Sequence, residues 1–105
     1  MKKISVIGAG LGGLSAAIRL AHKGFEVTVY EQNTVPGGKA RSISADGFRF
    51  DTGPSLLTMP FVIEELFTGT GENVNNFLSI KKLNNLCRYF YPDGTVLNAY
   101  SDVNK

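Results

Sequence analysis

The fold of this chain is decided near its N-terminus by the stretch Ile4-Ser5-Val6-Ile7-Gly8-Ala9-Gly10-Leu11-Gly12-Gly13-Leu14. The first four residues form a short, mostly apolar run, which is typical of a strand buried on both faces in a parallel sheet. The glycines that follow fit the pattern G-x-G-x-x-G. After them, apolar residues recur at positions 14, 17, 18 and 21, and this spacing predicts a helix with one apolar stripe.

The predicted helix has a marked end and is followed by a second strand. His22 and Lys23 complement the negative end of the helix dipole, and Gly24 suits a left-handed cap. Residues 25–30 then alternate between apolar and polar side chains, as strands do. Strand, glycine turn, helix and strand within 31 residues predict a right-handed, parallel βαβ unit.

In this context the glycines of the turn have roles in binding a dinucleotide. Gly8 permits the tight turn, Gly10 lets a pyrophosphate approach the backbone, and Gly13 lets the helix pack closely on the strand. The helix N-terminus offers unpaired N–H groups to the phosphates. Glu31 ends the second strand, where its carboxylate can accept hydrogen bonds from both ribose hydroxyls and repel a 2′-phosphate. The alternative is a plain flexible turn beside an unrelated surface glutamate.

A second glycine-rich segment, Pro36-Gly37-Gly38-Lys39-Ala40-Arg41-Ser42, begins soon after Glu31. Paired glycines free a backbone to approach a ligand, and two cations follow them within three positions. We expect this segment to close over the same pyrophosphate. A solvated linker is the alternative.

The rest of the chain is predicted to contain short strands and one helix. The predicted elements are a hairpin with arms at 41–45 and 48–51, a helix at 61–67, a strand near 78–83, and a hairpin with arms at 88–91 and 95–100. Four aromatic residues are interpreted as core side chains, with lining of a channel for an apolar substrate as the alternative; they are Phe48, Phe50, Phe61 and Phe67. Cys87 is interpreted as a small core residue.

Composition limits the function. The chain has 105 residues, enough for at most one ordinary domain, and a formal net charge of +2, too weak for an electrostatic grip on nucleic acid. The single Cys87 excludes an internal disulfide framework and a multi-cysteine zinc site, and no metal site is predicted. No apolar run approaches the roughly 20 residues that span a bilayer. We therefore expect a cytoplasmic protein.

Several stretches carry a family resemblance. Residues 6–17 and 27–31, with Gly37-Gly38-Lys39, resemble the N-terminal FAD signature of the flavoprotein superfamily that holds amine oxidases and carotenoid desaturases. The stretch Gly47-Phe48-Arg49-Phe50-Asp51-Thr52-Gly53-Pro54-Ser55-Leu56-Leu57-Thr58-Met59-Pro60, and residues 87–95, are similar to the phytoene desaturase branch. The resemblance covers nearly the whole chain.

The resemblance implies an α/β fold, in which a Rossmann-like FAD-binding βαβ unit is followed by the β-rich start of a substrate domain. Residues 1–60 would be the N-terminal part of the FAD-binding domain, and 61–105 the incomplete beginning of the substrate domain. Members of the family are several times longer than this chain. We therefore expect it to correspond to an N-terminal portion, apparently truncated.

The resemblance also implies FAD as the cofactor and assigns residues to it. Glu31 would bind the adenosine ribose, Gly38 and Lys39 would lie near the pyrophosphate and ribityl chain, and residues 53–55 would pass beside the flavin ring. The expected cofactor-binding residues are Gly8, Ala9, Gly10, Leu11, Gly12, Gly13, Glu31, Gln32, Gly38, Lys39, Gly53, Pro54 and Ser55. No catalytic residue is identified.

The activity that the resemblance implies is desaturation of an isoprenoid polyene such as phytoene, with hydride passing to the flavin. Two alternatives stay open: a non-catalytic FAD- or ADP-binding fragment, and a ketolase, isomerase or saturase relative. This segment alone is expected to be inactive and to associate with other chains through its exposed apolar faces. Peripheral membrane association of the full-length protein is a family expectation that this segment does not itself show.

Overall fold

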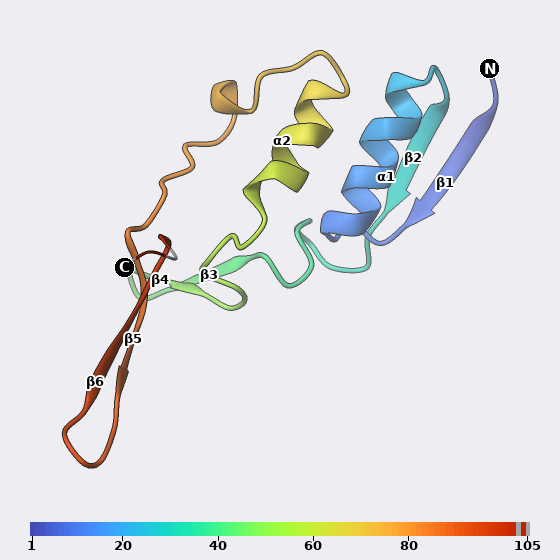
Figure 1. Cartoon of the computed structure of the whole chain (residues 1–105). Coiled ribbons are helices and arrows are strands. Elements are labelled where there is room, and N and C mark those ends of the chain that lie inside the picture. Colours follow the sequence, from blue (N-terminus) through green and yellow to red (C-terminus); the bar gives the residue numbers. More distant parts are fainter. Residues whose placement is uncertain (103, 105) are drawn as a thin grey trace.

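The computed structural model describes residues 1–102 and 104 and begins with the expected βαβ unit (Figure 1). Strand β1 (Lys3–Ile7) leads through the glycine turn into helix α1 (Leu11–His22), and strand β2 (Glu26–Tyr30) follows. The two strands pair in parallel, with Val6 opposite Val29. The βαβ prediction is therefore confirmed.

The period of the apolar residues explains how this unit packs. Helix α1 contacts both strands, and the residues of β1 and β2 alternate between half-buried and exposed. Val6 and Val29 lie on the half-buried face, whereas Ile7 is 81% exposed on the other. The prediction that the first strand is buried on both faces is wrong, because no second layer from the described residues covers the outer face of the sheet.

The C-terminal end of α1 is where the sequence predicted it, whereas its N-terminal end lies earlier than the apolar periodicity indicates. Gly24 adopts φ +85°, the left-handed conformation expected of a glycine just past a helix. The helix begins at Leu11, three residues before the first member of the apolar stripe. Periodicity locates the apolar side chains that face the sheet, and the first turn of α1, Leu11-Gly12-Gly13, adds no apolar side chain to that face because Leu11 is exposed. The glycine turn therefore leads directly into a helix N-terminus.

The first predicted hairpin is also present. Strands β3 (Ser42–Ala45) and β4 (Phe48–Asp51) pair in antiparallel fashion. Asp46 and Gly47 have φ values of +51° and +82°. Two successive positive φ values are typical of the turn that matches the right-handed twist of a two-residue hairpin.

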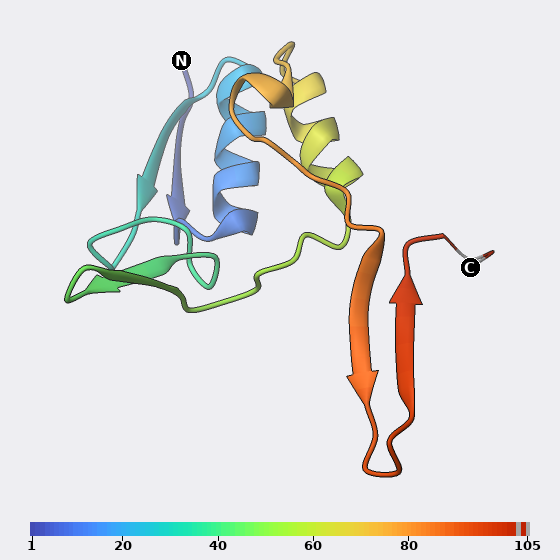
Figure 2. The ribbon, with the colours of Figure 1, turned by 90° about the vertical axis from the view of Figure 1, so that its left-hand side faces the viewer.

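The C-terminal half contains the predicted helix and hairpin, together with a 3-10 helix that was not predicted. It contains α2 (Pro60–Thr68), a short 3-10 helix (Val74–Asn76) and a hairpin of β5 (Asn85–Phe90) and β6 (Val96–Tyr100), which extends away from the βαβ unit (Figure 2). The predicted strand near 78–83 is wrong, because this stretch has no regular structure. A strand needs a hydrogen-bonding partner, and the described residues offer none there.

The apolar core is small. Its buried members are Ala9, Ala17, Leu66 and Val74. The radius of gyration of 18.4 Å exceeds the roughly 13 Å expected of a compact domain of this length. The described part of the chain contains no helix with the length and apolar character needed to cross a bilayer.

The small core overturns several interpretations of apolar residues. Phe48, Phe50 and Phe61 are exposed, and so is Cys87, so the core interpretation is wrong for all four. The cysteine and the first two phenylalanines lie on two-stranded hairpins, and such hairpins have no covering layer here. Phe67 is half-buried and packs on Phe77 with ring centroids 5.1 Å apart.

Candidate dinucleotide-binding site

The glycine turn between β1 and α1 is built as the motif predicts. Gly8 has φ +95°, which an L side chain rarely adopts, and its N–H donates to the carbonyl oxygen of Tyr30 over 2.7 Å. A Cβ atom on Gly13 would overlap the carbonyl oxygen of Gly8 and lie 3.6 Å from Val6 Cγ1. Glycines at these two positions therefore allow the tight turn and the close approach of helix to strand.

The N-terminus of α1 is open to an anion. The N-cap residue is Gly10, and α1 has neither a side-chain cap nor an acidic residue in its first turn. The N–H of Leu14 makes the first helical hydrogen bond, to the Gly10 carbonyl over 2.9 Å, so the preceding N–H groups have no partner in the helix. A Cβ on Gly12 would meet nothing within 4 Å. This end of the helix therefore fits a phosphate group by both charge and space.

Glu31 is tied to the glycine turn. Its Oε2 accepts a hydrogen bond from the Ala9 N–H over 2.7 Å, and its Oε1 accepts from the N–H and the Nδ2 of Asn33 over 2.9 and 2.7 Å. The pKa of Glu31 is lowered, chiefly by the backbone N–H of Asn33 and then by that of Ala9, because these donors favour the charged form. The end of β2 therefore presents an ionised carboxylate directly beside the turn.

The second glycine-rich segment contacts the first. The N–H of Gly37 donates to the Ala9 carbonyl over 2.7 Å, and Gly37 forms a parallel β-bridge with Gly10. Gly38 adopts φ +61°, and a Cβ on it would lie 3.0 Å from the Cα of Gly10. Two backbones can come this close only where both residues lack side chains. The solvated-linker alternative for residues 36–42 therefore does not describe this segment.

The predicted segment around Gly53 packs on the second glycine-rich segment, residues 36–42. A Cβ on Gly53 would overlap the carbonyl oxygen of Lys39. Next to it, the N–H and the hydroxyl of Thr52 both donate to the Arg41 carbonyl over 3.0 Å. The segments around Gly10, Gly38 and Gly53 are thus joined in series by close backbone contacts.

We expect Gly53→Ala to separate the third segment from the second. The added methyl group must displace the Lys39 carbonyl, at a cost of about 1–3 kcal/mol to that contact. Amide hydrogen exchange at Thr52 is expected to accelerate by about 5- to 150-fold. Ser55→Ala, two residues away, is the control. Unchanged exchange at Thr52 in Gly53→Ala would show that the contact is not present in solution.

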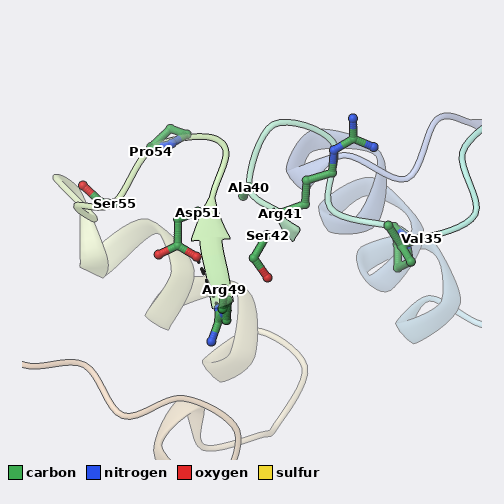
Figure 3. Close-up of a pocket in the computed structure, with 9 residues that line it drawn as sticks. Val35, Ala40, Arg41, Ser42, Arg49, Asp51, Pro54 and Ser55 are labelled. Atoms are coloured by element: carbon green, nitrogen blue, oxygen red, sulfur yellow. Dashed lines mark hydrogen bonds and ion pairs between the residues drawn. The ribbon is translucent and has the colours of Figure 1, made fainter. Parts of the chain in front are cut away.

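A shallow pocket of about 460 Å³ lies beside these segments (Figure 3). It is lined by Val35, Pro36, Ala40, Arg41, Ser42, Arg49, Asp51, Pro54 and Ser55. Arg49 donates to Asp51 Oδ1 over 3.3 Å from the same strand, and both side chains are exposed. The predicted residues Pro54 and Ser55 thus line a cavity next to the second glycine-rich segment.

The remaining predicted residues lie at the rim of the site, and two residues that the sequence analysis did not assign lie close to it. Leu11 and Gln32 are exposed, and the Gln32 backbone N–H also contributes to lowering the pKa of Glu31. Asn33 was missed, although an amide two residues after a carboxylate is a known short-range hydrogen-bonding pattern. Arg49 was not predicted to line the pocket, because the sequence of a hairpin does not indicate which other segments lie beside it.

Comparisons with known proteins identify the family of this chain. The family model described as "NAD(P)-binding Rossmann-like domain" matches residues 6–79, which include all three glycine segments. The chain belongs to this family. The Rossmann-like fold class is therefore confirmed, while the boundary at residues 60 and 61 stays a prediction.

The relatives and a solved structure extend the likeness over most of the chain. It is 49% identical over 102 residues to 4,4′-diaponeurosporene oxygenase from Staphylococcus aureus strain Mu50, and 48% identical to the same enzyme from strain NCTC 8325. Each match covers 97% of this chain and 20% of the relative. A crystal structure of a Pyrococcus furiosus protein superimposes with a TM-score of 0.62 at 26% identity, over 91% of this chain and 24% of that one.

These relatives are named for a carotenoid substrate, so the resemblance to carotenoid-processing enzymes is confirmed. The chain spans about a fifth of their length. The family description supports a dinucleotide cofactor in general.

Proposed function

We propose that this chain forms the ADP-binding part of an FAD-dependent oxidoreductase that acts on an isoprenoid polyene. The observation that carries the proposal is the meeting of three glycine segments beside an ionised carboxylate. Gly10 contacts Gly38, Gly53 contacts Lys39, and Glu31 bonds to Ala9 within the same turn. These contacts hold the glycine turn at the end of two parallel strands, where open α/β sheets bind nucleotides.

Each group of residues has a role in this proposal. The N–H groups at the start of α1 would bind the pyrophosphate, and Glu31 would accept hydrogen bonds from the adenosine ribose. Gly38 and Lys39 would add contacts near the pyrophosphate and ribityl chain, and residues 53–55 would pass beside the flavin ring. When bound, FAD supplies the capacity to accept hydride, while the protein supplies position and excludes competing reactions.

The polyene and the reaction type are the less constrained part of the proposal. The names of the relatives support a carotenoid substrate, and the resemblance of residues 47–60 supports desaturation of a compound such as phytoene. A ketolase, isomerase or saturase relative is the second candidate. The relatives are named oxygenases, which supports a reaction other than desaturation. A non-catalytic nucleotide-binding fragment is the third. Turnover of phytoene by this chain alone would exclude the third.

The proposal also covers association with other chains, cellular location and membrane association. The open apolar faces of the β1–β2 sheet and the two hairpins support association with other chains. We propose a cytoplasmic location, with peripheral membrane association belonging to the complete enzyme. Sedimentation of the purified chain alone measures its association with other copies, and sedimentation with liposomes measures its binding to membranes.

Calorimetric titration of the chain with FAD, ADP and NAD tests the cofactor. We expect FAD to bind more tightly than ADP, because the family resemblance implies that residues 53–55 contact the flavin half. Equal binding of FAD and ADP would leave a nucleotide cradle without a flavin site. Absence of binding to all three nucleotides would contradict the proposal.

A further inference from the structure

Asn33 holds the carboxylate of Glu31 with two donors. Its backbone N–H and its side-chain Nδ2 both donate to Oε1, over 2.9 and 2.7 Å. The other oxygen, Oε2, accepts from the Ala9 N–H over 2.7 Å. One oxygen is therefore fixed by the bend after β2 and the other by the glycine turn.

We propose that Asn33 is a positioning residue that orients Glu31 for selection of adenine nucleotides without a 2′-phosphate. This inference rests on the proposed function, because it concerns the same nucleotide site. Asn33 acts through Glu31 and is not expected to contact the nucleotide itself.

The physical argument begins with the freedom of the glutamate side chain. A half-exposed glutamate populates several rotamers, and a carboxylate that swings away from the turn neither accepts from a ribose nor repels a phosphate. The two Asn33 donors restrict Oε1, so that Oε2 remains directed at the turn. A carboxylate can accept about four hydrogen bonds, and the three present leave capacity for a ribose hydroxyl.

The charge state follows from the same contacts. The groups that face the Glu31 carboxylate in the described structure are the N–H groups of Ala9, Gln32 and Asn33 and the amide of Asn33, all of them uncharged. They favour the ionised form and lower the pKa of Glu31. Removing the Asn33 amide is therefore expected to raise that pKa.

Two measurements on Asn33→Ala test the role of this residue. The first is the NMR titration of the Glu31 side-chain carboxyl without ligand, which we expect to shift to a higher pKa. The second is the ratio of the dissociation constants for NADP and NAD, which differ only in the 2′-phosphate. We expect the preference for NAD to fall by about three- to ten-fold, the effect of one lost hydrogen bond to a charged group after screening by solvent.

The controls separate positioning from general damage to the bend. Asn33→Ser keeps a short donor and is expected to restore part of the preference, whereas Thr34→Ala alters the same bend without changing the Asn33–Glu31 pair and should match the wild type. Nucleotide binding with an unchanged Glu31 pKa and an unchanged ratio in Asn33→Ala would overturn the role of Asn33 alone. Failure of the wild type to bind any nucleotide would overturn the proposed function and this selection role together.

Discussion

Replacing Gly13 by alanine is expected to open the βαβ unit at its glycine turn. The new Cβ atom would overlap the carbonyl oxygen of Gly8, which is backbone and cannot rotate away. The first turn of α1 must therefore move from the end of β1, at a cost of about 1–3 kcal/mol. Amide exchange in the β1–β2 ladder is expected to accelerate by about 5- to 150-fold, and nucleotide binding should weaken with it.

Gly12→Ala is the matched control for this prediction. A Cβ at this neighbouring position would meet nothing within 4 Å, and alanine favours a helix by about 1 kcal/mol over glycine. We therefore expect Gly12→Ala to slow exchange in α1 slightly. If the amides of the β1–β2 ladder exchanged at the same rate in Gly13→Ala and Gly12→Ala, the close packing of α1 on the turn would be contradicted.

The second large effect is expected from Glu31→Gln. Glutamine keeps the size of the side chain, but its amide nitrogen cannot accept from Ala9 or from a ribose hydroxyl, and the negative charge is lost. On the proposed function, ADP affinity should fall by about ten- to a hundred-fold, as hydrogen bonds to charged groups are lost. The preference for NAD over NADP should disappear, because nothing remains to repel the 2′-phosphate.

The pH dependence of this effect has a definite sign. The pKa of Glu31 lies below its ordinary value of 4.5 in the folded chain. The contribution of the ionised carboxylate is therefore complete above about pH 4.5 and is lost as the pH falls through the lowered pKa. Nucleotide binding by the wild type should decline in this acidic window, measured by titration at successive pH values.

Glu26→Gln serves as the control for Glu31→Gln. Glu26 lies at the exposed start of β2, where its carboxylate is 3.4 Å from the Lys3 ammonium, and it is removed from the glycine turn. The same chemical change there is expected to leave ADP affinity and its pH dependence unchanged. Matching losses in both variants would mean that the effect comes from net charge and not from the site.

The predictions that the structure contradicts have a common physical origin. Two kinds of partner were expected that the described residues do not provide. A covering layer is missing over the outer face of β1 and over Phe48, Phe50 and Cys87, and a pairing strand is missing at residues 78–83. An apolar side chain shows that burial is favourable, but burial also needs a covering layer. Local signals carry no information about that layer.

By itself the sequence determined the local conformations of this protein. Glycine at positions 8, 24 and 47 permits positive φ, and apolar spacing separates strand from helix, so the βαβ unit and the first hairpin could be predicted. Only the tertiary structure decided which segments meet. Gly10 against Gly38, Gly53 against Lys39, and Glu31 against Ala9 depend on how segments distant in the sequence return to the turn. Such contacts arise from the path of the whole backbone, which no short window of sequence encodes.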